Sequence, residues 1–134
     1  VDVSVSAGYL RELGSDNGLW GRVAVAGDVG PARLTLNALG EHVFAANRDG
    51  IDVLLTAGAS ASLLSYLRVG AEYVVQDLEG LWDPEEADGG VRHFIGPNAI
   101  VVLYPGVQLA AGPSFGLSAG SPSVLGRIAA TYEF

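Results

Sequence analysis

The chain begins Val1-Asp2-Val3-Ser4-Val5-Ser6-Ala7-Gly8-Tyr9, and an apolar side chain stands at every odd position of this stretch. Successive side chains of a β-strand point to opposite faces, so this spacing predicts a strand with one apolar and one polar face. The same period of two recurs along the whole chain. It marks eight runs, at residues 1–9, 19–29, 32–41, 51–58, 66–76, 98–104, 107–118 and 124–134.

Two prolines and one apolar run complicate this pattern. The run at 98–104 is almost entirely apolar, so its facing stays ambiguous, and Leu54 breaks the alternation of the fourth run. Proline has no backbone N–H to donate to a sheet ladder. We therefore place Pro97 ahead of the sixth strand, and we interpret Pro113, next to Gly112, as a β-bulge.

The composition is that of a single β-domain, residues 1–134. The chain is 49% hydrophobic with a mean hydropathy of +0.35, yet no stretch approaches the roughly 18 consecutive apolar residues of a transmembrane helix. Its 19 glycines disfavour a helical bundle. Only 16% of the residues are charged, too few to cover a water-facing surface in the usual way. Cysteine is absent, which excludes a disulfide framework and thiol chemistry.

The connections between the runs alternate in length. Short turns are expected at 28–31, 60–62 and 104–106, and longer loops at 13–18, 45–50, 77–93 and 117–123. Bacterial outer-membrane barrels combine short periplasmic turns with longer outer loops. The pattern therefore predicts an all-β fold. We expect an eight-stranded antiparallel up-and-down transmembrane β-barrel, closed by pairing the first strand with the eighth and displaying four extracellular loops.

Alternation alone does not say which face of the sheet lies inside. The polar face is mostly small, as Ser4, Gly58 and Gly116 illustrate, and small side chains suit a crowded lumen. Its charges have both signs and can pair inside a barrel, where buried charges need partners. We therefore direct the apolar face toward lipid. The predicted luminal ionic network comprises Arg22, Asp28, Arg33, Glu41, Arg68, Glu72, Arg127 and Glu133.

The inside of an eight-stranded barrel is just wide enough for side chains to fill it. The ionic network is therefore interpreted as a plug of salt bridges. A narrow channel, or a conduit for small or hydrophobic solutes, is the alternative. A soluble lipocalin-like ligand-binding barrel is a second alternative, and it would turn the apolar face inward.

The last nine residues, 126–134, form the most specific motif. They end in Phe134, with Ile128, Ala130 and Tyr132 at alternate positions before it. This segment resembles the C-terminal β-signal of bacterial outer-membrane proteins, and the whole chain resembles the small eight-stranded OmpA/OmpX-like class in architecture. The resemblance implies a mature protein of the bacterial outer membrane whose signal peptide is absent from this chain. It also implies that the barrel-assembly machinery recognises these four residues during insertion.

The charges outside the lumen indicate candidate partners. A net charge of −8 argues against nucleic acid. Three arginines are expected near the outer rim, namely Arg11, Arg48 and Arg92. They can pair with the phosphates of lipopolysaccharide in the outer-membrane lipid, or they contribute only to solubility. The longest loop could bind an extracellular or envelope protein partner, or it could simply be a solvated tip. The residues that would contact a partner are Trp82, Asp83, Glu85, Glu86 and Asp88. Its acidic run lacks the ligand spacing of a calcium loop.

An enzyme is the remaining function class. A lipid-modifying barrel with a lipase-type mechanism needs a serine, a histidine and an acid brought together. His42 follows Glu41 and should point to the opposite face, and His93 lies at a loop end. No serine accompanies either at a recognisable spacing, and no metal-ligand cluster or phosphate loop is present in the sequence. We expect a structural or surface-interaction protein with no catalytic residue, metal or cofactor.

Overall fold

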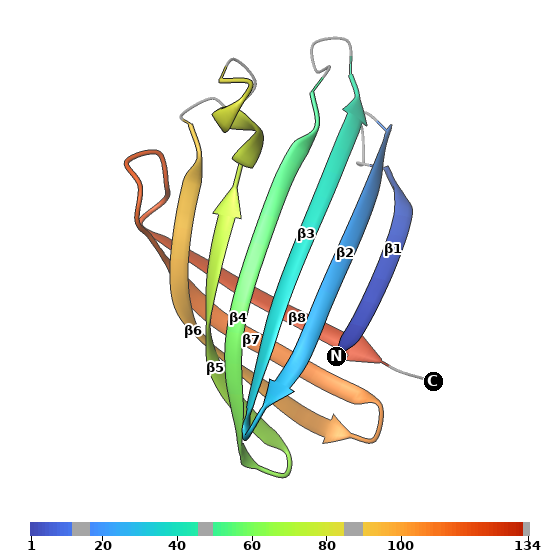
Figure 1. Cartoon of the computed structure of the whole chain (residues 1–134), viewed down its shortest axis with the longest axis vertical. Helices are drawn as coiled ribbons and strands as arrows, with labels where there is room; N and C mark the ends of the chain where they lie inside the picture. The colour runs from blue at the N-terminus through green and yellow to red at the C-terminus, as the bar shows by residue number, and fades with distance from the viewer. Residues whose placement is uncertain (12–16, 46–49, 85–89, 133–134) are drawn as a thin grey trace.

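The computed structural model of the chain is a single antiparallel sheet of eight strands, arranged in sequence order (Figure 1). It describes residues 1–11, 17–45, 50–84 and 90–132. The strands are β1 (Asp2–Arg11), β2 (Asn17–Val29), β3 (Ala32–Phe44), β4 (Asp52–Leu64), β5 (Leu67–Gln76), β6 (Arg92–Tyr104), β7 (Val107–Gly116) and β8 (Val124–Tyr132). A short 3-10 helix, η1 (Leu78–Leu81), follows β5. Within the described ranges, no helix is both long and apolar enough to cross a membrane.

The sheet is curled into a half-barrel, with β1–β4 and β6–β8 running at a steep angle to each other (Figure 1). The expected pairing of the first strand with the eighth is absent, because β1 pairs only with β2 and β8 only with β7 within the described residues. Each hairpin is specified locally by its turn. Pairing of β1 with β8 depends instead on the curvature and strand stagger of the whole sheet, which no local sequence pattern encodes.

The connections alternate between the two ends of the sheet as expected, with three tight turns at one end (Figure 1). Gly30 and Gly106 lie in two of these turns with φ of 60° and 83°, a left-handed conformation that glycine adopts without steric cost. The turn predicted at 60–62 is wrong. Strand β4 continues to Leu64, and the turn consists of Ser65 and Tyr66.

Both proline predictions are also wrong. Pro97 lies inside β6, opposite Ala71 of β5, and Pro113 lies inside β7, opposite Gly126 of β8, with no register shift at either position. The β6–β7 ladder is interrupted between the pairs Ile95–Phe115 and Ala99–Ala111. In that register Pro97 stands directly opposite Pro113. The two missing N–H donors therefore fall within one short interruption instead of two.

The register also settles the facing of the sixth strand. Phe94 is paired in register with Val74, and Val74 with Thr56, which places Phe94 on the same face as the polar residues of β4. By alternation Asn98 and Ile100 share that inner face, whereas Ile95 points outward. The period-two pattern thus holds from Asn98 to Val102, and the register with β7 shifts between Val102 and Tyr104.

The buried core is small and lies toward the loop end of the sheet. Phe94 and Val74 are 0% and 2% exposed, and Val43 is also buried. Each lies within three residues of the loop end of its strand. The rest of the inner face has smaller or polar side chains, so the hollow remains open toward the turn end.

Candidate functional site

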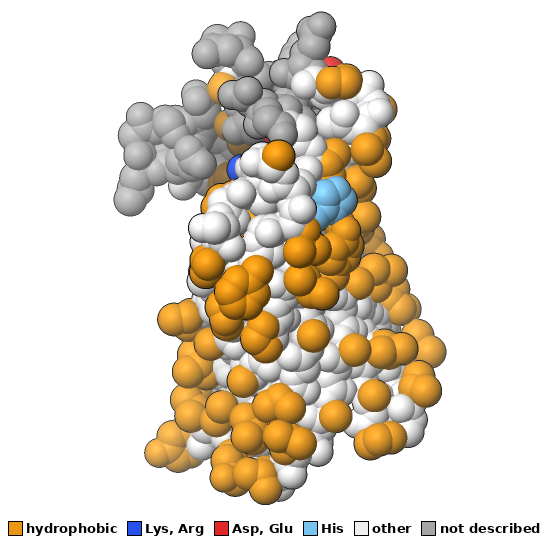
Figure 2. All heavy atoms as spheres, turned by 90° about the vertical axis from the view of Figure 1, so that its left-hand side faces the viewer, with side chains coloured by type: hydrophobic (Ala, Val, Ile, Leu, Met, Phe, Trp, Pro, Cys, Tyr) orange, Lys and Arg blue, Asp and Glu red, His pale blue; other side chains and the backbone are white. Residues whose placement is uncertain are grey.

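The outer face of the sheet is apolar and exposed. Val5 and Ile128 are 76% and 81% exposed. Figure 2 shows hydrophobic side chains spread over the strands from the lower end upward, with charged side chains visible only near the top. The other exposed large residues on the odd face of β1 and the matching faces of β2 and β3 are Val3, Tyr9, Leu19, Val23, Val25, Val29, Leu34, Leu36 and Phe44.

Two ion-paired groups lie on the inner face. Arg33 is 3.1 Å from the carboxylate of Asp28, its partner in the β2–β3 hairpin, and it also pairs with Asp2 of β1. On the other side of the hollow, Arg127 of β8 pairs with Glu72 of β5. The Asp28–Arg33 pair joins neighbouring strands, whereas the Asp2–Arg33 and Glu72–Arg127 pairs join strands that are not neighbours in the sheet and so hold its curl.

The remaining residues of the predicted ionic network have other partners. Arg22 donates to Asn37 at 3.0 Å, and Asn37 donates onward to Thr56 at 2.9 Å. Arg68 donates to the hydroxyl of Ser62 at 3.2 Å and of Ser60 at 3.5 Å. Glu41 lies on the inner face opposite Trp20 and Asp52 in register, and Glu133 lies outside the described residues. Four of the eight predicted residues therefore form two separate ion-paired groups, with Asp2 added.

The loop end of the hollow is filled by apolar side chains, which sequence reasoning missed. We call Val43, Val74 and Phe94 the apolar plug. Phe94 lies at the start of β6, where the sequence predicted loop, and Val74 lies on a face assigned to polar residues. Thr56, which is 7% exposed, is in register with Val74 and accepts the hydrogen bond from Asn37. The plug is therefore continuous with the polar part of the lumen.

Helix η1 covers the top of β4 through one buried carboxylate. Glu79 is 3% exposed, and its Oε2 accepts a hydrogen bond from the backbone N–H of Val53 at 2.6 Å. Val53 lies on the part of β4 beyond Leu55, the last β4 residue that pairs with β5. Glu79 therefore accepts a hydrogen bond from a backbone N–H of β4 that has no ladder partner in β5.

We expect Glu79→Ala to destabilise the folded protein by about 1–3 kcal/mol, because the Val53 N–H loses its acceptor. Glu79→Gln keeps an acceptor oxygen and should lose less. Hydrogen exchange of the Val53 amide is the measurement. Exchange should accelerate in the alanine variant and change little in the glutamine variant. Unchanged protection in Glu79→Ala would contradict this role.

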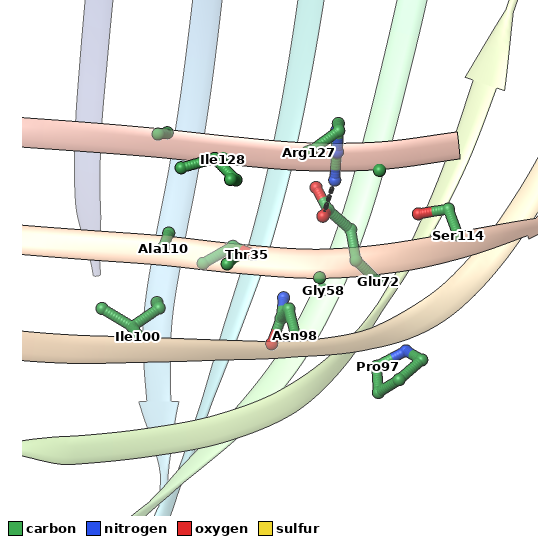
Figure 3. Close-up of a pocket in the computed structure, with 14 residues that line it drawn as sticks. Thr35, Gly58, Glu72, Pro97, Asn98, Ile100, Ala110, Ser114, Arg127 and Ile128 are labelled. Carbon is green, nitrogen blue, oxygen red and sulfur yellow. Dashed lines mark hydrogen bonds and ion pairs between the residues drawn. The ribbon is translucent and has the colours of Figure 1, made fainter. Parts of the chain in front are cut away.

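A half-open cavity of about 600 Å³ lies on the inner face at mid-height. Figure 3 shows Glu72, Arg127 and Asn98 pointing into it, with Thr35 and Gly58 contributed by the opposite side of the hollow. The Oδ1 atom of Asn98 is buried and has no hydrogen-bond partner among the described residues. An unpaired buried acceptor is uncommon in folded proteins and needs an explanation.

Both histidines contact ordinary structural partners. His42 Nδ1 is 2.7 Å from the carbonyl oxygen of Gly50, and its ring meets Phe44 edge-on. His93 Nδ1 is 2.7 Å from the hydroxyl of Tyr73, and the two rings stack. The hydroxyls of Ser118 and Ser121 contact the backbone of His93 and not its ring. These contacts attach the β7–β8 connection to the start of β6.

The predicted rim and loop residues are described only in part. Arg92 pairs with Asp77 across the base of the longest loop, and Arg11 is the exposed last residue of β1. Trp82 is 64% exposed, and the backbone N–H of Asp83 donates to the carbonyl of Glu79 at 2.8 Å. Residues of these sets that lie outside the described ranges are Arg48, Glu85, Glu86 and Asp88. Within the described ranges, no three acidic or histidine side chains gather as a metal site.

The predicted assembly signal lies on the outer face of the last strand. Ile128, Ala130 and Tyr132 all point outward from β8 and are exposed, and Phe134 lies outside the described residues. Comparison of the chain with family models, curated proteins and solved structures gave no match.

Proposed function

We propose that the protein is an integral barrel of the bacterial outer membrane, with a plugged lumen and a structural or surface-interaction role. The observation that carries this proposal is the exposed apolar outer face. A water-soluble barrel of the lipocalin type would bury that face inside. Here most large exposed aliphatic side chains point outward, and below the apolar plug the inner face is mostly small and polar, the arrangement suited to lipid outside.

The positions of the five tyrosines support a membrane environment. All five are exposed, and they lie toward the two ends of the sheet. Tyr66, Tyr104 and Tyr132 are at the turn end, and Tyr9 and Tyr73 are toward the loop end. Aromatic girdles occur at both interfaces of outer-membrane barrels because their amphipathic rings favour the headgroup level.

The contents of the lumen favour a structural role over conduction. The apolar plug fills the loop end, and below it Arg33 and Arg127 pair with carboxylates while Arg22 and Arg68 donate to neutral side chains. A narrow channel remains the alternative function. In the proposed orientation the long loops face outward, where Trp82 is available to a protein partner and Arg11 to lipopolysaccharide phosphates. The outward residues of β8 would be read by the barrel-assembly machinery during insertion.

Gel mobility in detergent tests the membrane assignment. We expect the chain to require detergent or lipid for solubility, and to migrate faster unboiled than boiled once folded into phosphatidylcholine vesicles. This expectation includes pairing of β1 with β8 in lipid, because a closed barrel leaves no unpaired edge, is compact and resists detergent until boiling unfolds it. The boiled sample of the same preparation is the control. A protein that is soluble without detergent and shows no shift would contradict the proposal and favour the soluble barrel.

A further inference from the structure

A second hollow lies at the turn end of the inner face. Its volume is about 490 Å³, and its lining comes from β3 to β7 and from the turn between β4 and β5. Among the described residues, none from the edge strands β1 and β8 lines it, so pairing of these two edges in a closed barrel would leave its lining intact. It shares Thr35 and Ile100 with the mid-height cavity, and the apolar plug lies beyond that cavity. In a closed barrel the hollow is therefore a pocket that is open at the turn end and closed toward the loops.

The charged residues that line this hollow are both arginines, although the chain has a net charge of −8. They are Arg33 and Arg68, and no carboxylate lines the hollow within the described ranges. Arg33 is already neutralised, because it pairs with both Asp2 and Asp28. The positive charge that remains for a ligand is that of Arg68.

The guanidinium of Arg68 is half-buried and its partners are neutral. It donates to the hydroxyl of Ser62 at 3.2 Å and of Ser60 at 3.5 Å. Both contacts are at or beyond the usual length of an N–H···O hydrogen bond, so the five donors of the guanidinium are not used up. Glu72, the nearest carboxylate on the inner face of the same strand, pairs with Arg127 instead. A half-buried cation without a carboxylate partner among the described residues favours an anionic ligand.

The rest of the lining suits an anion that carries an apolar body. The hydroxyl of Ser65 and the amide of Gln108 also line the hollow, and both groups can donate to anionic oxygens. Ile100 and Val102 of β6 contribute an apolar wall. Ile100 stands opposite Arg68 in the β5–β6 register, so the cationic and the apolar part of the lining lie side by side.

We propose that this turn-end pocket binds a small organic oxyanion, a phosphomonoester or a carboxylate, which enters from the aqueous phase at the turn end. The planar guanidinium of Arg68 donates to the anionic head, and the apolar body lies against Ile100 and Val102. The volume is within the usual range of small-molecule sites. A pocket closed toward the loops holds such a ligand and does not conduct it. The inference goes beyond the proposed function and rests on it only for the direction of entry, which is the periplasmic side.

The first test compares four probes by nuclear magnetic resonance of the backbone amides, with the full chain in phosphatidylcholine nanodiscs. The probes are the anions phenyl phosphate and benzoate, neutral benzyl alcohol and cationic phenethylammonium. We expect saturable shifts of the amides around Arg68 and Gln108 with one or both anions, at an affinity at least tenfold higher than for benzyl alcohol. The relative affinities of the two anions identify the preferred head. No saturable shift with either anion, or an equal affinity for a neutral or cationic probe, would overturn the anion site.

The second test removes the charge of Arg68. Arg68→Gln should weaken the binding of the oxyanion by about ten- to hundredfold, the loss expected for hydrogen bonds to a charged group. Arg22→Gln is the matched control, because it removes the same charge from the inner face of β2, where Arg22 donates to Asn37 and does not line the hollow. Its affinity should change less than twofold. Equal losses in the two variants would indicate an effect of net charge alone and overturn the site.

The heat-dependent gel shift of every sample separates this proposal from the membrane assignment. A wild-type protein that shows the shift but binds neither anion overturns the pocket and leaves the barrel in place. A protein that is soluble without detergent and binds an oxyanion through Arg68 contradicts the membrane assignment and keeps the pocket. The comparison of probes on the wild type decides the proposal even where Arg68→Gln does not fold.

Discussion

Val5→Arg is expected to lower folding into lipid vesicles by roughly 30- to 700-fold. An arginine on the lipid face near the bilayer midplane costs about 2–4 kcal/mol, and each 1.4 kcal/mol is tenfold in an equilibrium constant. Val5 lies in the middle of β1, on the outer face, and is 76% exposed. In the proposed orientation its side chain contacts the acyl chains.

Ser4→Arg is the matched control, because Ser4 is the neighbouring residue on the inner face of the same strand. Its arginine would project into the polar hollow, where Asp2 lies two residues away on the same face. The folded fraction is measured by gel shift across a urea series in vesicles. Equal losses in the two variants, or a larger loss in Ser4→Arg, would contradict the lipid-facing assignment of the odd residues of β1.

The strands and their two faces were predictable because their signal is local. Val5 and Ser4 differ in facing simply because they are adjacent in a strand. The pairing of Asp28 with Arg33 had a similar local signal, since a two-residue turn places them opposite each other. The pairing of Arg127 with Glu72 had none, because it depends on how far the sheet curls.

The prolines show why a sound rule gave a wrong strand boundary. Excluding Pro97 from the sixth strand moved its predicted start to 98 and left Phe94 in a loop. The observed register places Pro97 opposite Pro113, so a single interruption serves both. Continuing the alternation backward from Asn98 through Gly96 to Phe94 would have located the most buried side chain. Placing Pro97 inside the strand, however, requires knowing that it lies opposite Pro113, and the sequence of one strand does not contain that long-range register.

Phe94→Ala is expected to lower the free energy of unfolding by about 3–5 kcal/mol, the range for truncating a fully buried phenylalanine. Phe94 is 0% exposed and is the largest side chain of the apolar plug. The measurement is a urea titration of the folded protein in vesicles. Phe115→Ala is the control, because Phe115 points outward from β7 and is 47% exposed. Similar losses in the two variants would contradict a packed core at the loop end.

The same variant separates a plugged lumen from a channel. The cavity left by Phe94→Ala lies beside Val74, whose neighbour in register, Thr56, belongs to the polar part of the lumen, so water and small ions gain a path where the wild type has apolar packing. We therefore expect planar bilayers to show no single-channel conductance with wild type or Phe115→Ala, and measurable conductance with Phe94→Ala. Conductance already present in the wild type would contradict a lumen closed by the apolar plug and favour the channel. In that channel the side chains of the apolar plug would have to move aside for ions to pass.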